Sequence, residues 1–285
     1  MRILVIGGDS RMKYAAAKFG SEIYNPSTDG TFDMIVLPMP LAASGRKHPV
    51  CDSVAAASSS VLPITRDGET IFAPLAEIPL PFDIIGRFAD KGAMVFAGGE
   101  CERLTEICAE HGFTLVNYAK YEPLTLKNAA LTAEAAVCLL SNSTEHSLLG
   151  SRILITGYGR IASMTAERLK AFGAEITVAA RRSEQRIQAE LDGFRAVTIA
   201  EIPDIISEFD YTVNTVPAVI FDEECLAKMR GVFLELATLP NDPPDNPEVK
   251  YIHGGGLPGK HYPETAGEYI AQAINEIYRA SLRAQ

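Results

Sequence analysis

The sequence has little of several features that would assign a protein to a specialised class. Its five cysteines are scattered and contain no Cys-x-x-Cys pair, which argues against a disulfide framework and against a zinc site. Lys and Arg total 26 against 36 Asp and Glu, and the formal net charge of -10 argues against a nucleic-acid-binding surface. We therefore expect a small-molecule ligand, no metal site and a reducing compartment.

Long apolar runs are also scarce. The N-terminal run, MRILVIGGDS, is too short before its glycines to form the core of a signal peptide. No other stretch approaches the roughly 18 apolar residues of a membrane helix. The 285 residues, 47% hydrophobic and 22% charged, are instead typical of a folded soluble protein with two domains. We expect a cytoplasmic protein with no membrane partner.

What the sequence does have is a strand-turn-helix pattern that begins twice, at RILVIGGDSRM (2–12) and at RILITGYGRIA (152–162). Strands alternate with helices after each start, which predicts parallel sheets and an α/β fold of two doubly wound Rossmann-like domains with a cleft between them. The expected parts are an N-terminal flavodoxin/Rossmann-like domain, a linking helix, a nucleotide-binding Rossmann domain and a C-terminal helix that returns to the first domain. Their boundaries are 1–121, 122–150, 151–262 and 263–285.

Two segments between these starts need separate treatment. Repeated prolines interrupt residues 39–92, where we expect loop, short strands and a hairpin. From Glu122 to about Glu145, Ala and Leu recur at helical spacing, and Pro123 is tolerated in the first turn. This pattern predicts one long helix.

The residues GYGRIA (157–162) match the pattern G-x-G-x-x-A between a strand and a helix. Gly157 permits the tight turn, and Gly159 lets the backbone approach a pyrophosphate at the helix N-terminus. The alternative is a glycine turn that merely connects strand to helix, which the surrounding order of elements disfavours. We expect dinucleotide contacts from Gly157, Tyr158, Gly159, Arg160 and Ile161.

The end of the next strand, AARRS (179–183), contains no acidic residue. An NAD enzyme usually has one there for the ribose hydroxyls. Arg181, Arg182 and Ser183 offer instead the donors that a 2′-phosphate requires, so we expect NADP as the cofactor. The alternative is a solvated pair of surface arginines.

The first turn, Gly7-Gly8-Asp9-Ser10, lacks the dinucleotide spacing, and Asp9 would repel a pyrophosphate. We therefore place no second dinucleotide there. Ser10 is a candidate cap for the following helix. Arg11 and the helix N-terminus are candidates to hold a substrate carboxylate, and a plain capped turn is the alternative.

Several short segments along the chain are distinctive. They are IGGDSR (6–11), LPMPLAASG (37–45), FAGG (96–99), KNAALTAEAA (127–136), GYGRIA (157–162), AARRS (179–183), NTVPAVI (214–220), ELATLP (235–240) and GLPGKHYPETAG (256–267). Together they resemble the A subunits of dipicolinate synthases, whose architecture is like that of the D-2-hydroxyacid dehydrogenases. The resemblance covers nearly the whole chain, and GLPGKHYPETAG is its most specific part.

The resemblance implies NADP-dependent oxidation of dihydrodipicolinate, or of 4-hydroxytetrahydrodipicolinate that loses water to it, to dipicolinate in the mother cell of a sporulating bacterium. It also implies a small dicarboxylate substrate and, as partner, a flavoprotein-like B subunit. Apolar faces on the linking and final helices permit a homodimer.

Oxidising a dihydropyridine removes a hydride and a proton, so the protein has to supply orientation and charge. We expect the ends of two strands to lie at the carboxyl edge of the second sheet, where their residues would frame the nicotinamide. The alternative is that they are ordinary strand ends that bind no ligand. Their residues are Asn214, Thr215, Val216 and Pro217 after one strand, and Leu236, Ala237 and Thr238 at the end of the next.

A dicarboxylate substrate needs cationic or hydrogen-bonding partners. The candidates for binding are Arg11, Asn128, Thr132 and Thr265, and those for catalysis are Lys260 and Glu134. Asn128 and Thr132 share one helical face, and Glu134 is the only acid in the apolar part of that helix. The alternatives are core or cap residues for the first two and an exposed helix-face charge for Glu134.

Two other functions remain open. A D-2-hydroxyacid-dehydrogenase-like oxidoreductase shares the domain plan, but no convincing Arg follows ELATLP, and its expected histidine loop reads GGGLPGK. A non-catalytic NADP-binding regulatory subunit is the second alternative, because no catalytic residue is unmistakable.

Overall fold

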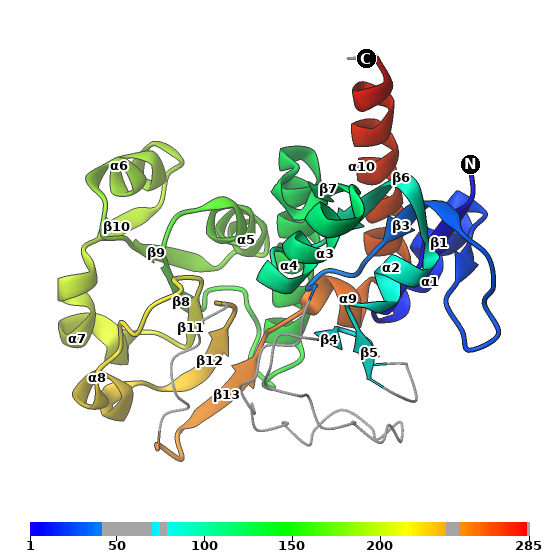
Figure 1. The fold of residues 1–285 in the computed structure, drawn as a ribbon. Coiled ribbons are helices and arrows are strands. Elements are labelled where there is room, and N and C mark those ends of the chain that lie inside the picture. The colour runs from blue at the N-terminus through cyan, green and yellow to red at the C-terminus, as the bar shows by residue number, and fades with distance from the viewer. Residues whose placement is uncertain (42–69, 75–78, 238–244, 284–285) are drawn as a thin grey trace. The chain divides into compact units, whose positions relative to one another are not determined.

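The computed structural model describes residues 1–41, 70–74, 79–237 and 245–283 (Figure 1). The chain divides into two compact units, Met1–Lys127 with Tyr262–Gln285 (unit 1) and Asn128–His261 (unit 2). Each unit contains one parallel sheet with helices packed against it. The predicted α/β fold class is therefore confirmed.

Unit 1 is built on a five-stranded parallel sheet in the order β2-β1-β3-β6-β7, the strand order of flavodoxin-like folds. The strands are β1 (Ile3–Val5), β2 (Glu22–Ile23), β3 (Phe32–Val36), β6 (Ala89–Ala97) and β7 (Thr114–Asn117). The helices are α1 (Ser10–Phe19), α2 (Ile84–Phe88), α3 (Glu102–His111) and α10 (Pro263–Arg283), with a 3-10 turn η1 (Tyr118–Lys120).

Both faces of this sheet are buried, which explains the nearly continuous apolar runs of its strands. Side chains alternate between the two faces along a strand. In β1, Leu4 packs in the cluster that contains Ile85 of α2 and Leu104 of α3, whereas Val5 packs in the cluster that contains Ile270 of α10.

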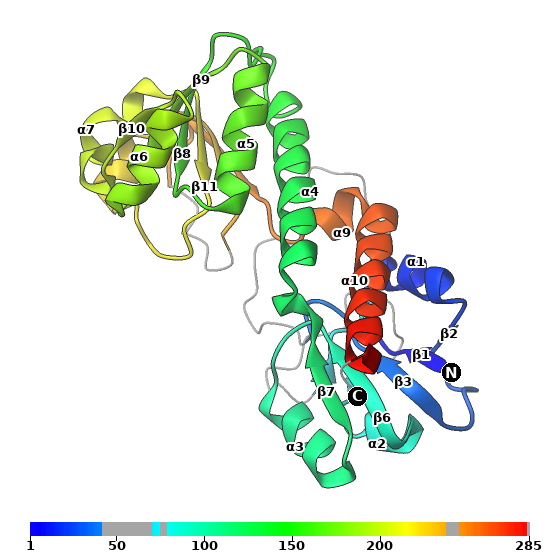
Figure 2. The same ribbon diagram turned by 90° about the horizontal axis from the view of Figure 1, so that it is seen from above.

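Helices α1 and α10 lie side by side in unit 1 (Figure 2). Their close approach depends on Gly267, because a Cβ atom there would lie 2.3 Å from the carbonyl oxygen of Arg11 and 2.7 Å from Cβ of Tyr14. Ala266 beside it is fully buried. The Ala-Gly pair thus lets the two backbones meet.

We expect Gly267→Ala to destabilise the protein. Overpacking against a backbone costs about 1–3 kcal/mol, which exceeds the gain of up to ~1 kcal/mol from replacing a helical glycine. Urea denaturation should therefore show a lower midpoint for Gly267→Ala. The exposed Arg279→Ala in the same helix should change the free energy of unfolding by less than about 0.5 kcal/mol. An unchanged midpoint for Gly267→Ala would show that the contact is not tight.

Unit 2 is built on a six-stranded parallel sheet in the order β10-β9-β8-β11-β12-β13, the Rossmann order. The strands are β8 (Arg152–Thr156), β9 (Glu175–Ala179), β10 (Arg195–Val197), β11 (Tyr211–Asn214), β12 (Gly231–Glu235) and β13 (Val249–His253). The helices are α4 (Glu122–Ser141), which begins in unit 1, α5 (Arg160–Ala171), α6 (Ser183–Leu191), α7 (Ile202–Ile205), α8 (Glu223–Lys228) and α9 (Leu257–His261), with 3-10 turns η2 (Ile199–Glu201) and η3 (Ile206–Glu208).

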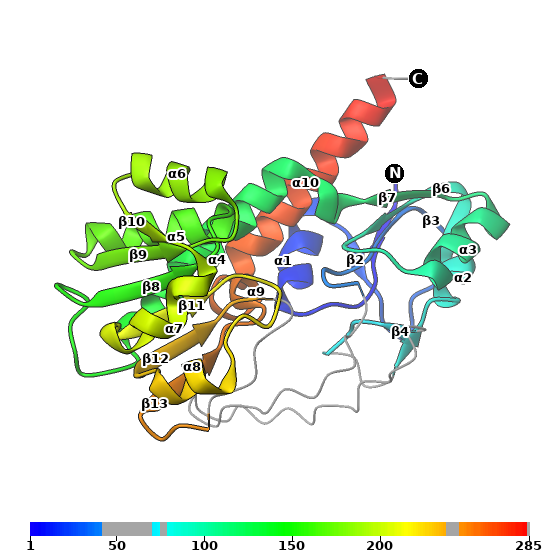
Figure 3. The ribbon, with the colours of Figure 1, turned by 90° about the vertical axis from the view of Figure 1, so that its left-hand side faces the viewer.

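The helices of unit 2 cover its sheet in two groups. α7 and α8 lie near β11 and β12 (Figure 3), where Ile202 and Cys225 pack with Phe233 in one core. α5 and α6 contact β8, β9 and β10. Right-handed crossovers that leave the central strands in opposite directions place the two groups on opposite faces.

The structure corrects several local predictions. In residues 39–92, β4 (Thr70–Ile71) and β5 (Leu80–Pro81) form an antiparallel pair, but α2 and the first residues of β6 were not predicted. Residues 42–69 and 75–78 lie outside the described chain. The long helix α4 ends at Ser141 instead of continuing to about Glu145. The sequence after the short strand that ends near Ile199 predicts one helix over 201–208, but the structure divides this segment between the end of η2, α7 and η3.

The expectation that no apolar stretch approaches the length of a membrane helix also needs correction, because the 20-residue helix α4 is long enough to span a membrane. Its mean hydropathy of 1.2 makes it the one helix in the described residues that could cross a membrane by length and composition. A core helix passes the same test, and Ala133, Ala135 and Ala136 of α4 are fully buried within the protein.

Candidate functional site

The carboxyl edge of the unit 2 sheet contains a point where the chain leaves neighbouring strands in opposite directions. From β8 it continues to β9 and β10, and from β11 it continues to β12 and β13. Ligands of open α/β sheets bind outside the strand ends at such a point. The strands end in register there, because Asn214 of β11 pairs with Thr156 of β8 and with Glu235 of β12.

The two glycines of the loop after β8 have different roles. Gly157 has a φ of 81°, and a Cβ atom on it would lie 2.9 Å from Oγ1 of Thr215, in the loop after β11. A Cβ atom on Gly159 would meet nothing within 4 Å. Gly157 therefore lets two loops meet, and Gly159 leaves the backbone open to a ligand.

Helix α5 begins directly after this loop and can receive an anion. Its N-cap residue is Gly159, which provides no side-chain cap to the first backbone N–H groups. These N–H groups and the helix dipole favour a pyrophosphate. Ala162 is fully buried, as close packing of helix on sheet requires, whereas Arg160 is exposed and Ile161 is half-buried.

The side chain of Tyr158 is committed to the protein. It is buried, and its hydroxyl donates a hydrogen bond of 2.6 Å to Oδ2 of Asp192. Its ring meets that of Phe194 edge-on, with centroids 6.2 Å apart. Burial, and then the bond to Asp192, raise the pKa of the phenol above its ordinary value. Tyr158 therefore anchors the glycine loop, and any cofactor contact from this residue falls to its backbone.

Two arginines follow β9. Arg181 and Arg182 are exposed, and neither guanidinium has a hydrogen-bond or ion-pair partner among the described residues. Ser183, also exposed, opens α6. The turn is held by Arg186, whose Nη1 donates to the carbonyls of Ala180 (2.9 Å) and Arg181 (2.8 Å).

A buried row of polar side chains crosses three strand ends of unit 2. Oγ1 of Thr156 donates to Oδ1 of Asn214 at 2.5 Å, and Nδ2 of Asn214 donates to both carboxylate oxygens of Glu235 at 2.8 and 2.9 Å. The backbone N–H of Ala237 also donates to Glu235 at 2.8 Å. All three row residues have no exposed surface.

Sequence reasoning placed Asn214 at this edge but missed Thr156 and Glu235. The available signal was a lone acid in the apolar strand VFLELA (232–237). It shows that a polar partner is needed, but not which residue supplies it.

The other strand-end residues expected near the nicotinamide lie at the same edge. Oγ1 of Thr215 donates to the carbonyl of Thr156 at 2.7 Å. Val216 is half-buried and Pro217 is exposed, whereas Ala237 is buried. Thr238 lies outside the described residues.

The first glycine turn, in unit 1, is closed. The N–H of Gly8 donates to the carbonyl of Phe72 at 2.7 Å, and a Cβ atom on Gly7 would lie 2.8 Å from the side chain of Ile71. Ile71 of β4 and Phe72 directly after it thus cover the backbone that a pyrophosphate would have to reach.

The helix after this turn is capped by Asp9, so the prediction of a Ser10 cap was wrong. Asp9 accepts from the backbone N–H of Arg11 at 3.0 Å, while Ser10 is already the first helical residue. The Arg11 side chain, 9% exposed, pairs with Asp9 at 2.8 Å and donates to the carbonyl of Met39. This favours the capped turn over a substrate-binding arginine.

The remaining substrate candidates are divided between the units, with Arg11 and Thr265 in unit 1 and Asn128, Thr132 and Lys260 in unit 2. Thr265 is half-buried in the first turn of α10. Thr132 donates through its hydroxyl to the carbonyl of Asn128 at 2.8 Å.

The two catalytic candidates, Glu134 in α4 and Lys260 in α9, lie in different surroundings. Glu134 is exposed. A role as a base would need an enclosed position, and Glu134 does not have one. Lys260 lies in α9, where partial burial lowers the pKa of its ammonium group although much of the residue is exposed. Oδ1 of Asn128 is buried and has no hydrogen-bond partner in the described chain.

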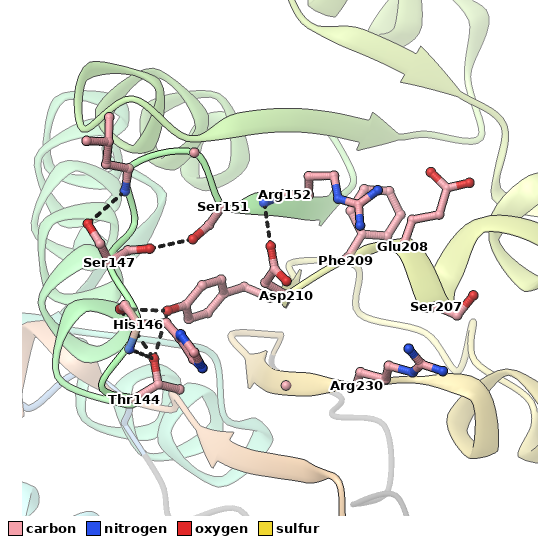
Figure 4. A pocket seen from close by; sticks show the side chains of 14 residues that line it. Thr144, His146, Ser147, Ser151, Arg152, Ser207, Glu208, Phe209, Asp210 and Arg230 are labelled. Atoms are coloured by element: carbon pink, nitrogen blue, oxygen red, sulfur yellow. Dashed lines mark hydrogen bonds between the residues drawn. The ribbon is translucent and has the colours of Figure 1, made fainter.

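A cavity of about 520 Å³ opens at the other, amino edge of the unit 2 sheet (Figure 4). Residues at the starts of three strands line it, among them Arg152, Tyr211 and Gly231. Arg152 is fixed through its backbone N–H to Oδ2 of Asp210 at 2.8 Å. None of the predicted site residues lines this cavity. In the described part of the chain, no group of His, Cys, Asp and Glu could hold a metal ion.

Residues 128–232 match the family described as D-isomer specific 2-hydroxyacid dehydrogenase, NAD binding domain. With the Rossmann strand order and the open glycine loop, this match defines unit 2 as a dehydrogenase-type domain for a nicotinamide dinucleotide.

The comparison with whole proteins is more specific. The chain is 25% identical to the A subunit of dipicolinate synthase from Bacillus subtilis (strain 168), over 97% of this chain and 95% of that protein. The solved structure of the Bacillus subtilis A subunit matches with a TM-score of 0.77 and 20% identity, covering 100% of this chain and 98% of that one. The A subunit from Bacillus halodurans matches with a TM-score of 0.75 and 20% identity, covering 97% of each. The predicted resemblance to the A subunits of dipicolinate synthases is confirmed.

The different environments of the two loop glycines yield a prediction. Gly159→Ser should leave the free energy of unfolding unchanged or a few tenths of a kcal/mol higher, because serine is a good N-cap. Its side chain would occupy the N–H groups that a pyrophosphate needs, so we expect the dissociation constant for nicotinamide dinucleotides to rise about tenfold. Calorimetric titration measures this constant, and unchanged affinity would exclude Gly159 from the binding site.

Gly157→Ala serves as the contrast. Its positive φ and its contact with Thr215 should make alanine destabilising by about 1–2 kcal/mol, as urea denaturation would show.

Proposed function

We propose that this protein oxidises dihydrodipicolinate to dipicolinate with NADP⁺ as the hydride acceptor, as the A subunit of a dipicolinate synthase, starting either from dihydrodipicolinate itself or from 4-hydroxytetrahydrodipicolinate, which would first lose water. The observation that carries this proposal is the end-to-end similarity to the A subunit of the Bacillus subtilis enzyme, which covers 97% of this chain and therefore both units. The dehydrogenase-type nucleotide domain supports the reaction class, because the ring is oxidised by loss of a hydride and a proton.

The choice of NADP is supported by the charges after β9. A 2′-phosphate needs cationic donors, and Arg181 and Arg182 are exposed cations without partners in the described chain. The short segment between Ala179 and Ser183 contains no carboxylate that would accept a ribose hydroxyl or repel the phosphate.

The other residues would bind and orient the reactants. The bound nicotinamide supplies the acceptor for the hydride. Gly159 and the α5 N-terminus would hold the pyrophosphate, and Asn214 with the following loop would frame the nicotinamide. Lys260, with its lowered pKa, would bind a substrate carboxylate or take up the proton. Asn128 and Thr265 remain proposed donors to the dicarboxylate, whereas the one hydroxyl hydrogen of Thr132 is donated to the carbonyl of Asn128.

The proposal includes a partner and a location. The protein would work with a flavoprotein-like B subunit in the cytoplasm of the mother cell of a sporulating bacterium. The similarity to a protein that is named as one subunit of an enzyme supports the existence of such a partner.

Replacing the two arginines tests the cofactor. We expect Arg181→Ala and Arg182→Ala each to weaken NADP⁺ binding about tenfold, since a hydrogen bond to a charged group contributes about 1.5–3 kcal/mol. Binding of NAD⁺, which lacks the phosphate, should stay within about twofold. Calorimetric titration of both dinucleotides gives the comparison.

Arg230→Ala is the matched control, because Arg230 is an exposed arginine beside the cavity at the opposite edge of the same sheet. It should leave both affinities unchanged. If the Arg181 and Arg182 variants bound NADP⁺ as tightly as the wild type, the proposed binding of the 2′-phosphate by these arginines would be wrong.

Formation of dipicolinate tests the reaction. We expect ultraviolet absorbance of dipicolinate to appear when the protein is mixed with its candidate B subunit, NADP⁺ and freshly made 4-hydroxytetrahydrodipicolinate. Reactions with the protein alone show whether the partner is required. Absence of product in both mixtures, despite demonstrated NADP⁺ binding, would favour the non-catalytic regulatory role. Oxidation of simple D-2-hydroxyacids would favour the dehydrogenase alternative.

A further inference from the structure

Glu235 is the only acidic side chain among the described residues that is fully buried. Burying a carboxylate is costly unless hydrogen-bond donors surround it. Its donors include the amide of Asn214 and the backbone N–H of Ala237. The neighbouring positions Leu234 and Leu236 are apolar, so packing alone does not require an acid between them.

Through these bonds Glu235 fixes the backbone of two loops. It receives the N–H of Ala237, which follows β12. It also holds Nδ2 of Asn214, while Oδ1 of Asn214 accepts from Thr156 and from the backbone N–H of Val216 at 3.0 Å. Nδ2 donates in addition to the carbonyl of Val216 at 3.1 Å. One carboxylate thus determines the conformation after β11 and after β12.

These two loops lie where the nicotinamide half of a dinucleotide has to be. With the pyrophosphate at Gly159 and the adenosine half toward Arg181 after β9, the other half extends across the ends of β11 and β12. We propose that Glu235, acting through Asn214, is a positioning residue for the nicotinamide half of the cofactor. This inference rests on the proposed NADP binding by unit 2.

The test compares two ligands on the full-length protein, NADP⁺ and 2′-phospho-ADP-ribose, which lacks the nicotinamide. In Glu235→Gln, an NH₂ group would face the NH₂ group of Asn214, so the row cannot keep its geometry. We expect NADP⁺ to bind about tenfold more weakly while the affinity for 2′-phospho-ADP-ribose changes less than about twofold.

A double variant tests the coupling of the two side chains. In the Asn214→Ala background, the amide through which Glu235 would act is absent. The N–H of Ala237 keeps an acceptor, because the side-chain carbonyl of Gln at position 235 accepts as a carboxylate oxygen does. We expect Glu235→Gln to weaken NADP⁺ binding less than about twofold in that background, against about tenfold in the wild type, which a general packing defect would not do.

Two further variants keep the test decisive. Thr156→Val removes the hydroxyl donor to Asn214 with little change in shape, and it should weaken NADP⁺ selectively by about threefold even if Glu235→Gln fails to fold. Thr212→Val is the control, because Thr212 is buried in the same strand as Asn214 and its hydroxyl has no partner in the described chain. It should leave both affinities unchanged.

The possible failures are distinguishable. If the wild type bound neither ligand, the proposed function would fail, and this inference with it. If the wild type bound both, but Glu235→Gln and Thr156→Val weakened the two ligands equally or not at all, only the positioning role would be overturned. The same conclusion follows if Glu235→Gln weakened NADP⁺ binding equally in the wild type and in the Asn214→Ala background.

Discussion

The carboxylate of Glu235, buried at the end of β12, is the constraint on which the carboxyl edge of unit 2 depends. Without water it needs donors at fixed places, and Asn214 of the adjacent strand supplies two of the bonds. Asn214 can donate these hydrogen bonds only because β11 and β12 pair in a register that places Asn214 opposite Glu235. A slip of one residue would turn one of the two side chains to the other face, so the buried polar bond and the strand register support each other.

The two strand-turn-helix starts show how similar sequences acquire different uses. At both starts, a turn that contains glycines follows a strand, and a helix begins after the turn. In unit 1 the residues around β4 close over the turn, and Asp9 caps the helix with its own carboxylate. In unit 2 Gly159 leaves the helix uncapped and open. An anion therefore meets an N-terminus without a side-chain cap at the second start, whereas a carboxylate already caps the first.

Features carried by a short stretch could be predicted from the sequence. The loop GYGRIA and the arginines of AARRS lie at a strand end because each follows one apolar run directly, and alternation of strands and helices predicted the parallel sheets. Features that depend on partners distant in the sequence could not. Glu235 lies 21 residues from Asn214, and Asp192 lies 34 residues from Tyr158, so neither bond follows from local pattern. Ser10 and Asp9 are both good cap residues, and only the backbone conformation decides between them.

The segments that carry the resemblance to the A subunits of dipicolinate synthases do not all support the same conclusion. The most specific one, GLPGKHYPETAG, ends in Gly267, whose role is to let α10 approach α1. That role explains a packing requirement and no chemistry. In GYGRIA, AARRS and NTVPAVI, by contrast, the residues lie at the carboxyl edge of the unit 2 sheet. The backbone at Gly159 is open, Arg181 and Arg182 have no side-chain partner among the described residues, and the buried row lies beside them. Similarity at Gly267 therefore supports the fold of unit 1, whereas Lys260 of the same segment belongs to unit 2 as a proposed substrate contact. The argument for a dehydrogenase depends on the carboxyl edge of unit 2.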